Sequence, residues 1–385
     1  MPTVLIAPDK FKGSLTAAEV AEAVATGLRR ARPDLEVSTL PVADGGDGTL
    51  AAALAAGFTE VPVTAAGPTG EPVRSRYARR GDLAVVEMAD VSGLVRLPGS
   101  RPAPMTASSR GAGEVVAAAV SAGCRRVVLG IGGSASTDGG AGLVRALGAR
   151  LLDEHGAEID DGGVGLPRLA RLELGTLRDL MAGVSVTVAC DVDNPLTGPT
   201  GAAAVYGPQK GADPAQVREL DVALARWADQ VAGVVGRDQR DEPGAGAAGG
   251  VGFAALALLG ADLQPGIELV LDLVGFAHRV EGADLVVTGE GALDEQTLRG
   301  KAPAGVAAAA RRHGVPVVAV CGSNSLDPER LHAAGITAAY ALLDREPDLQ
   351  RCLTQAPALL AALGEIIAVG HLAERPARSA EGTTP

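Results

Sequence analysis

The chain has 385 residues, of which 47% are hydrophobic and only 2% aromatic, and it carries a formal net charge of −12. The length allows two domains, and the acidic balance without any run of lysine or arginine argues against a nucleic-acid partner. A core poor in aromatic side chains must be built from Ala, Val and Leu, which favours helices packed closely on sheets.

The N-terminal region alternates strand-like and helical stretches, the pattern of βαβ units in a mostly parallel sheet. Residues 3–8 (TVLIAP) predict a strand, and Thr16 with Glu19 forms a capping box that opens a helix. Residues 36–43 predict the next strand, and the glycine-rich turn DGGDG at residues 44–48 follows it before a short helix. This turn therefore stands between the end of a strand and the start of a helix.

The pattern changes near Glu60. Residues 73–79 and 83–88, joined by an Arg-Gly-Asp turn, predict a β-hairpin rather than a crossover unit, and we interpret them as part of a second domain. Further strands are predicted at residues 126–131 and 184–190.

The βαβ rhythm returns after about Gly282, with strands predicted at residues 284–288, 315–320 and 337–342 and helices between them. A sheet begun at the N-terminus and resumed near the C-terminus implies a discontinuous domain.

We therefore expect an α/β protein in which residues 1–62 and 280–372 form one mostly parallel domain. Residues 63–279 form a second, inserted α/β domain, and a cleft lies between the two. Residues 373–385 are expected to be a disordered tail.

Five polar loops combine Gly with Asp, Glu, Lys, Ser or Thr. Because ligands of open α/β sheets bind beyond the carboxyl ends of strands, such loops are candidate ligand sites. Any one of them could be an ordinary Asx or glycine turn, but five together favour a functional site. They are residues 9–15, 44–49, 130–142, 191–198 and 289–303.

One of these loops matches a dinucleotide-binding pattern. Residues 130–135 read Gly-x-Gly-x-x-Ala after a strand, and Asp153 lies about 20 residues further on, as an NAD site requires. The same pattern recurs at residues 250–255 in a chain with 52 glycines, so it does not single out NAD. Such a loop offers backbone N–H groups at a helix N-terminus to any phosphate. The Gly-Lys pair at Lys301 lacks the spacing of a P-loop.

Asp191 and Asp193 directly follow an apolar strand, with Asn194 and Pro195 after them. Two carboxylates at this spacing suit a metal, or a general base beside a metal ligand, although an Asx-Pro turn explains them equally well.

Lysine is rare in this chain and arginine supplies the other cations, so a lysine in a polar loop suggests a compact cation aimed at an anion. The four lysines are Lys10, Lys12, Lys210 and Lys301.

The four cysteines are scattered, without Cys-x-x-Cys or metal-ligand spacing, which indicates a reduced intracellular protein. The apolar residues 3–7 follow Met1 without a basic leader, and no uncharged apolar run reaches about 18 residues. We expect a cytoplasmic protein with no membrane partner.

Together these motifs resemble the bacterial glycerate kinases of the class that lacks a P-loop. The resemblance covers about residues 2 to 370. The matching segments are residues 8–15, 41–49, 130–140, 191–198, 201–211, 243–250 and 289–303. Asp47 stands where the family usually has Glu, and Ser136-Thr137 stands where Thr-Asn is usual, departures that bear on fine geometry.

The resemblance implies a Rossmann-like domain plus a second α/β domain, with a cleft between them. It also implies a kinase that uses ATP and Mg²⁺ to phosphorylate a hydroxyl of D-glycerate. The expected product is 2-phosphoglycerate, with 3-phosphoglycerate as the alternative. An NAD-dependent hydroxy-acid oxidoreductase and a non-catalytic receptor for small anions remain open, as does the choice between monomer and homodimer.

Phosphoryl transfer depends on charge neutralisation and positioning, so the polar loops are assigned roles on this basis. We take Asp191 as the general base, because it follows a buried strand, with Lys10 as a second catalytic residue and Asp193 and Asp44 as metal ligands. The predicted substrate-binding residues are Lys12, Asp44, Gly45, Gly46, Asp47, Ser109 and Arg110. The predicted nucleotide-binding residues are Gly132, Gly133, Ser134, Ser136, Thr137, Asp138, Lys210, Glu290 and Lys301.

Overall fold

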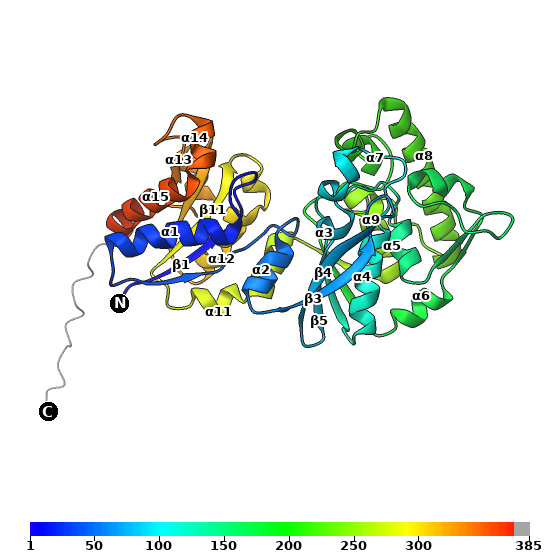
Figure 1. Cartoon of the computed structure of the whole chain (residues 1–385), viewed down its shortest axis with the longest axis horizontal. Coiled ribbons are helices and arrows are strands. Elements are labelled where there is room, and N and C mark those ends of the chain that lie inside the picture. The colour runs from blue at the N-terminus through cyan, green and yellow to red at the C-terminus, as the bar shows by residue number, and fades with distance from the viewer. Residues whose placement is uncertain (373–385) are drawn as a thin grey trace. The chain divides into compact units, whose positions relative to one another are not determined.

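The computed structural model describes residues 1–372, which form two compact units (Figure 1). The first unit contains Met1–Val42 and the described residues from Gly275 onwards, and the second contains Ala43–Val274. The boundary expected at residue 62 differs from this division, because it falls inside the strand Thr59–Ala66, which pairs within the sheet of the second unit. The boundary expected at residue 280 lies inside the first unit, which resumes at Gly275. The tail expected at residues 373–385 lies outside the described residues.

The first unit is built on a five-stranded parallel sheet with strand order β13-β12-β11-β1-β2. The chain moves outward in one direction from β1 and in the other from β11, so these two neighbours mark the topological switch point of the sheet. The strands are β1 (Thr3–Pro8), β2 (Glu36–Thr39), β11 (Leu285–Leu293), β12 (Val317–Asn324) and β13 (Ala338–Ala341). The helices are α1 (Ala17–Ala31), α11 (Phe276–Val280), α12 (Ala302–Arg312), α13 (Pro328–Ala333), α14 (Leu349–Thr354) and α15 (Ala356–His371).

Local sequence signals set the start of α1. The Thr16 side chain accepts a hydrogen bond from the Glu19 backbone and the Glu19 carboxylate accepts one from the Thr16 backbone, which confirms the predicted capping box. Figure 1 shows α1 and α15 side by side, and the two helices touch where a Cβ on Gly27 would lie 1.8 Å from the Ala361 carbonyl oxygen. Both helices contribute to one hydrophobic core with β1, β11 and β12.

The second unit is built on a six-stranded mixed sheet with strand order β10-β9-β6-β5-β4-β3. The neighbours from β10 to β5 run parallel, whereas β3, β4 and β5 pair antiparallel, which confirms the predicted hairpin. The strands are β3 (Thr59–Ala66), β4 (Pro72–Arg80), β5 (Leu83–Glu87), β6 (Arg126–Gly130), β9 (Ser185–Ala189) and β10 (Asp262–Gln264), with a separate hairpin of β7 (Arg150–Leu152) and β8 (Arg171–Glu173).

Helices cover both faces of this sheet. On one face, α2 and α10 pack through Leu50 and Leu269 onto residues such as Val128. On the other face lies the larger core, to which β6, α4, α5, α8 and α9 contribute. The helices of this unit are α2 (Thr49–Ala55), α3 (Ala89–Ser92), α4 (Arg110–Ser121), α5 (Ala141–Ala146), α6 (Gly175–Leu180), α7 (Ala202–Tyr206), α8 (Pro214–Val235), α9 (Ala247–Leu259) and α10 (Gly266–Val274).

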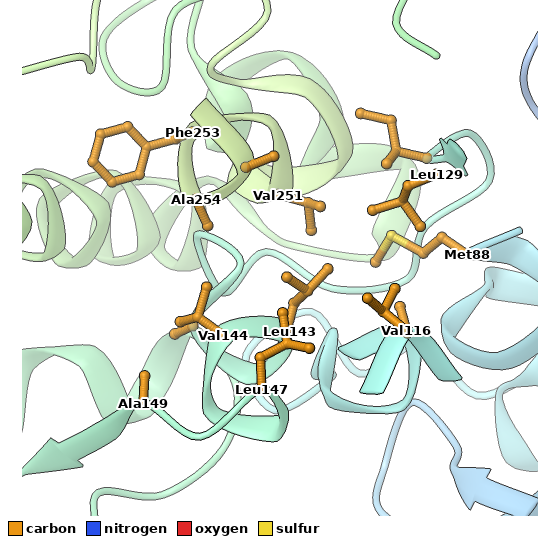
Figure 2. Close-up of a cluster of buried hydrophobic side chains, with 14 of the residues drawn as sticks. Met88, Val116, Leu129, Leu143, Val144, Leu147, Ala149, Val251, Phe253 and Ala254 are labelled. Carbon is orange, nitrogen blue, oxygen red and sulfur yellow. The ribbon is translucent and has the colours of Figure 1, made fainter. Parts of the chain in front are cut away.

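Figure 2 shows the centre of the larger core, where Leu129 of β6, Leu143 of α5 and Val251 of α9 meet. The single tryptophan, Trp227 of α8, is fully buried in the same core and donates a hydrogen bond to the Gly139 carbonyl at 2.9 Å. Aliphatic side chains therefore supply almost the whole core, as the composition predicts.

The structure confirms the predicted fold class, a mixed α/β protein whose sheets are mostly parallel. None of the described helices combines the length and apolar composition needed to cross a lipid bilayer.

Candidate active site

A pocket of about 250 Å³ opens in the second unit, beside the loops that follow β6 and β9. Its position agrees with the rule that ligands of parallel sheets bind beyond the carboxyl ends of the strands. The lining residues are Asp44, Gly45, Gly46, Leu94, Ile131, Gly132, Gly133, Ser134, Ala189, Cys190, Asp191, Val192, Tyr206, Gln209, Lys210, Ala247 and Ala248.

The first wall of the pocket is the turn at residues 44–48, here called the acid loop. Its backbone lies directly against two other segments: a Cβ on Gly132 would lie 2.7 Å from the Gly46 Cα, and a Cβ on Gly266 would lie 1.9 Å from the Asp44 carbonyl oxygen. No side chain fits at either contact, so glycine there allows three backbone segments to meet at the pocket.

Asp191 and Asp44, two of the predicted site acids from loops distant in the sequence, both line the pocket. Asp191 is exposed overall, yet partial burial of its carboxyl raises the pKa to about 6. A hydrogen bond donated by the Gly266 backbone N–H at 2.8 Å opposes this rise, and the negative charge of Asp44 adds to it. The carboxyl can therefore gain and lose a proton near neutral pH.

Lys210 is the cation of the pocket and is only 2% exposed. Its Nζ donates to the Ser134 hydroxyl at 3.0 Å and to the Ser136 carbonyl oxygen. Burial lowers its pKa to about 8, although the negative charge of Asp138 favours the protonated form. The ammonium group has three protons, so two protein acceptors leave one for a ligand in the pocket.

The loop at residues 130–142, here called the glycine loop, lines the pocket only with its first half. Its second half is organised around Asp138, whose buried carboxylate accepts hydrogen bonds from the Ser109 backbone and hydroxyl, both at 2.8 Å. The backbone N–H groups of Gly140 and Gly142 also donate to it, at 3.1 and 3.2 Å. The first N–H groups of α5 are thus occupied by Asp138, so the binding of a phosphate there stays a prediction that this geometry does not support.

Eight of the predicted site residues in the second unit come together in the pocket. They are Asp44, Gly45, Gly46, Gly132, Gly133, Ser134, Asp191 and Lys210. The other seven are absent from its described lining: Asp47, Ser109, Arg110, Ser136, Thr137, Asp138 and Asp193. Arg110 instead forms ion pairs with Glu114 and Asp161, and Asp193 is exposed. The roles assigned to these seven stay predictions.

Some pocket residues were missed by the sequence analysis. The Tyr206 hydroxyl donates to the Asn194 amide oxygen at 2.6 Å, and Gln209 lies one residue before Lys210. Ala248 has a φ of 53°, a strained conformation for a residue other than glycine, and such strain is concentrated at functional sites. The glycine-rich segment that contains it, residues 243–250, is one of the segments that resemble the glycerate kinases, but no residue in it was assigned a role.

The remaining predicted residues, Lys10, Lys12, Glu290 and Lys301, belong to the first unit. Lys10 and Lys12 follow β1, and Glu290 lies on its neighbour β11, so these residues mark the switch point of that sheet. Glu290 is 7% exposed and accepts a hydrogen bond from the Thr297 hydroxyl, and Lys301 Nζ lies 3.7 Å from its Oε2.

A smaller and mainly apolar pocket of about 90 Å³ lies at the same edge of the first sheet. Phe11 and Lys12 contribute to it from the loop after β1, Gly291 and Ser323 from β11 and β12, and Leu353 from α14. The first unit therefore places a cation and an apolar slot at the edge where doubly wound sheets bind ligands.

Within residues 1–372, no three or more His, Cys, Asp or Glu side chains form a group that could hold a metal ion by itself. The acids of the second-unit pocket are the pair Asp44 and Asp191, whose like charges raise the pKa of the latter. Such a pair suits Mg²⁺ that arrives with other oxygen ligands, because Mg²⁺ is usually held by one or two carboxylates, waters and substrate phosphates.

Comparison with known proteins gives one consistent result. The Glycerate kinase family matches residues 4–371. A glycerate kinase of Bacillus subtilis (strain 168) is 46% identical over 343 residues, which cover 88% of this chain and 90% of the relative. A protein of Escherichia coli (strain K12) named glycerate 2-kinase is 43% identical over 343 residues, with the same coverage of 88% and 90%. A crystal structure from Salmonella typhimurium LT2 that carries the name glycerate kinase 2 matches with a TM-score of 0.84 at 42% identity, and the match covers 96% of this chain and 97% of that one.

Proposed function

The chain belongs to the glycerate kinase family, and we propose that it transfers the γ-phosphate of ATP to the 2-hydroxyl of D-glycerate, giving 2-phosphoglycerate. The observation that carries the proposal is the second-unit pocket, in which a carboxyl with a pKa of about 6 and a buried lysine line one small cavity. The choice of the 2-hydroxyl is supported by the Escherichia coli relative, whose name specifies a 2-kinase.

We assign this pocket to glycerate. Its volume of about 250 Å³ lies below the roughly 300–1,000 Å³ of pockets that enclose drug-sized ligands, so it suits a three-carbon acid better than a nucleotide. Gly132, Gly133, Ser134 and Lys210, which sequence analysis gave to the nucleotide, are therefore proposed to bind glycerate. The third proton of Lys210 is the donor for the glycerate carboxylate.

In this proposal Asp191 is the general base. It accepts the proton of the glycerate 2-hydroxyl, that oxygen forms a bond to the γ-phosphorus, and the bond from phosphorus to the departing ADP oxygen breaks. A base works best when its pKa lies close to the working pH, and a value of about 6 meets this condition. The Gly266 N–H holds one carboxylate oxygen in place, which fixes the direction of the other.

We assign the nucleotide to the carboxyl edge of the first sheet. Lys10, Lys12 and Lys301, three of the four lysines, belong to this unit, and the switch point between β1 and β11 is where doubly wound sheets bind nucleotides. The lysines supply the charge that a triphosphate requires in an otherwise acidic protein. Glu290 pairs with Lys301 and orients its ammonium group.

The Asp44 carboxylate would hold Mg²⁺ together with phosphate oxygens and water. When bound, the ion neutralises charge on the phosphates. Asp193, the other predicted ligand, is exposed outside the pocket lining and is a weaker candidate.

The proposed reaction is tested by incubating the protein with D-glycerate and Mg-ATP and recording proton and phosphorus NMR spectra of the product. Phosphorus coupled to the single proton at C2 identifies 2-phosphoglycerate. Coupling to the two protons at C3 identifies 3-phosphoglycerate and overturns the proposed position of transfer. Absence of ADP formation overturns the kinase activity itself.

The structure offers little support for an NAD-dependent oxidoreductase. Asp153, the acid expected at the ribose, accepts hydrogen bonds from the His155 and Ala157 backbones and pairs with Arg168. The N–H groups at the start of α5 are used by Asp138. Incubation with D-glycerate and NAD⁺ tests this alternative, because it predicts NADH absorbance.

We also propose a cytoplasmic location. All four cysteines lie in the described residues as free thiols, as is usual in a reducing compartment. The choice between monomer and homodimer stays a prediction for light scattering to settle.

A further inference from the structure

Glu87, the last residue of β5, holds the acid loop at the end where it enters α2. Its Oε2 accepts hydrogen bonds from the backbone N–H groups of Gly48 at 3.1 Å and Leu50 at 2.9 Å. These two donors lie where the acid loop enters α2. Asp44, Gly45 and Gly46, at the other end of the loop, line the pocket.

The start of α2 depends on this carboxylate. Gly48 stands at the N-cap in a left-handed conformation, with a φ of 108°, and has no side chain that could satisfy the first N–H groups of the helix. Glu87 supplies the missing cap. It lies 39 positions after Gly48 and 37 positions after Leu50 in the sequence. The conformation of the loop is therefore fixed by a residue distant in the sequence.

A carboxylate is a costly choice for this role. Glu87 is only 6% exposed, and burial raises its pKa to about 7, although the bonds from Leu50 and Gly48 favour the ionised form. The charged groups that face it are Asp47 from the acid loop and Asp90 from α3, and both raise the pKa further. An amide could accept the same two hydrogen bonds without burying a charge, so the charge itself requires an explanation.

Glu87 is also connected to the glycine loop, which forms another wall of the pocket. Glu87 pairs in register with Gly130, where the glycine loop begins. A Cβ on Gly130 would lie 2.8 Å from the Gly45 carbonyl oxygen, so the two loops touch through backbone atoms. A shift of the acid loop would therefore displace both walls of the pocket.

We propose that Glu87 is a positioning residue that fixes the acid loop for glycerate binding, and that its ionisation tightens this loop as the pH rises. The proposal rests on the assignment of the pocket to glycerate. Ionised Glu87 is the stronger acceptor for the two N–H groups. Protonation below about pH 7 weakens both bonds, and the KM for glycerate rises as the pH falls through the pKa of Glu87.

The test uses the variants Glu87→Gln and Glu87→Leu in the full chain. Leu removes the acceptor and is expected to raise the KM for glycerate about tenfold or more. The Kd of metal-free ADP should change less than about twofold, because only the Mg²⁺ of the nucleotide complex is assigned to Asp44 of the acid loop. Gln keeps an acceptor without a titratable group. It is expected to hold the glycerate KM within about threefold of the wild-type value at pH 8 and to remove the inflection near pH 7.

Asp153→Asn is the matched control, because Asp153 is also a buried carboxylate that accepts two backbone N–H bonds, at 2.9 Å each, but its donors His155 and Ala157 lie outside the acid loop and the pocket lining. It is expected to leave the KM for glycerate and the Kd of metal-free ADP unchanged. An equal loss of affinity for glycerate and for metal-free ADP in Glu87→Leu, or an inflection near pH 7 that persists in Glu87→Gln, would overturn the positioning role. If Glu87→Leu fails to fold, the pH profile of Glu87→Gln still decides.

A second readout separates this proposal from the assignment of the function. Hydrogen exchange of peptides that cover residues 41–56 reports on the acid loop without any substrate. Faster exchange in Glu87→Leu but not in Asp153→Asn supports the anchoring of the loop even if the wild-type protein forms no phosphoglycerate. Unchanged exchange in Glu87→Leu overturns it even if the kinase activity is confirmed.

Discussion

The Oδ1 atom of Asp191 lies 2.8 Å from the backbone nitrogen of Gly266, the first residue of α10. This hydrogen bond fixes the carboxylate at the pocket wall, where it shares the lining with Asp44. The geometry separates two properties of Asp191 that substitution can test individually: its position, which the bond to Gly266 maintains, and its ability to accept a proton.

Asp191→Asn keeps an oxygen that can accept the Gly266 bond but removes the base. We expect kcat to fall by roughly 10² or more while the KM for ATP stays within about twofold of the wild-type value. Asp262→Asn, at an exposed acid on β10, is the control and should leave kcat unchanged. A near-normal kcat in Asp191→Asn would remove Asp191 from the role of general base.

Loss of the Lys210 proton at alkaline pH is expected to weaken glycerate binding. Burial lowers its pKa to about 8, so the cation is present below that pH and is lost as the pH rises through it. The KM for glycerate should therefore rise above about pH 8, by about tenfold per pH unit, whereas kcat at saturating glycerate changes less. Steady-state kinetics between pH 7 and 9.5 measure both quantities.

Lys210→Gln tests the same charge at a single pH. The amide can still donate to the acceptors Ser134 and Ser136, but it carries no charge. The KM for glycerate at pH 7 should increase by about 10–100-fold and should lose its alkaline rise. Arg218→Gln, an exposed cation on α8, is the control. An alkaline rise of equal size in Lys210→Gln would show that another group titrates.

Lys301 tests the assignment of the nucleotide to the first unit. Its ammonium lies 3.7 Å from Glu290 Oε2, and its side chain remains 31% exposed, so it can reach a phosphate from a defined position. Lys301→Met should weaken ADP binding, measured by calorimetry, by about tenfold and leave glycerate binding unchanged. Arg312→Met, an exposed cation at the other end of α12, serves as the control. Weakened glycerate binding with normal ADP binding would reverse the assignment.

Features set by neighbouring residues could be predicted from the sequence. The capping box of Thr16 and Glu19 and the hairpin of β4 and β5 depend on contacts within a few residues, and both are confirmed. The strand β3 was missed, because its assignment depends on pairing with β4 at the edge of the sheet. The same strand explains why the boundary expected at residue 62 differs from the division of the units.

In the candidate site, too, features that depend on neighbouring residues could be predicted and features that depend on distant contacts could not. Glycine next to a polar residue after a strand identified Asp44, Gly132 and Asp191, because this pattern is local. It could not show that Asp138 turns inward to accept bonds from Ser109, since these partners lie 29 residues apart. Glu87 gave no signal at all: at the end of an apolar strand it resembles any residue that begins a turn.

The packing of α1 on α15 gives a prediction about stability that is independent of the pocket. A Cβ on Gly27 would lie 1.8 Å from the Ala361 carbonyl oxygen, a backbone atom that cannot move without displacing α15. Gly27→Ala should therefore lower the free energy of unfolding by about 1–3 kcal/mol, although alanine is the better helix former. Gly233→Ala is the matched control, because Gly233 also lies inside a helix, α8, and among the described residues an added Cβ there would meet no heavy atom within 4 Å beyond its chain neighbours and the backbone of its own helix. That variant should gain about 0.5–1 kcal/mol. Denaturant titration of both variants measures the difference, and equal stabilities would show that α1 and α15 are packed less closely than the structure indicates.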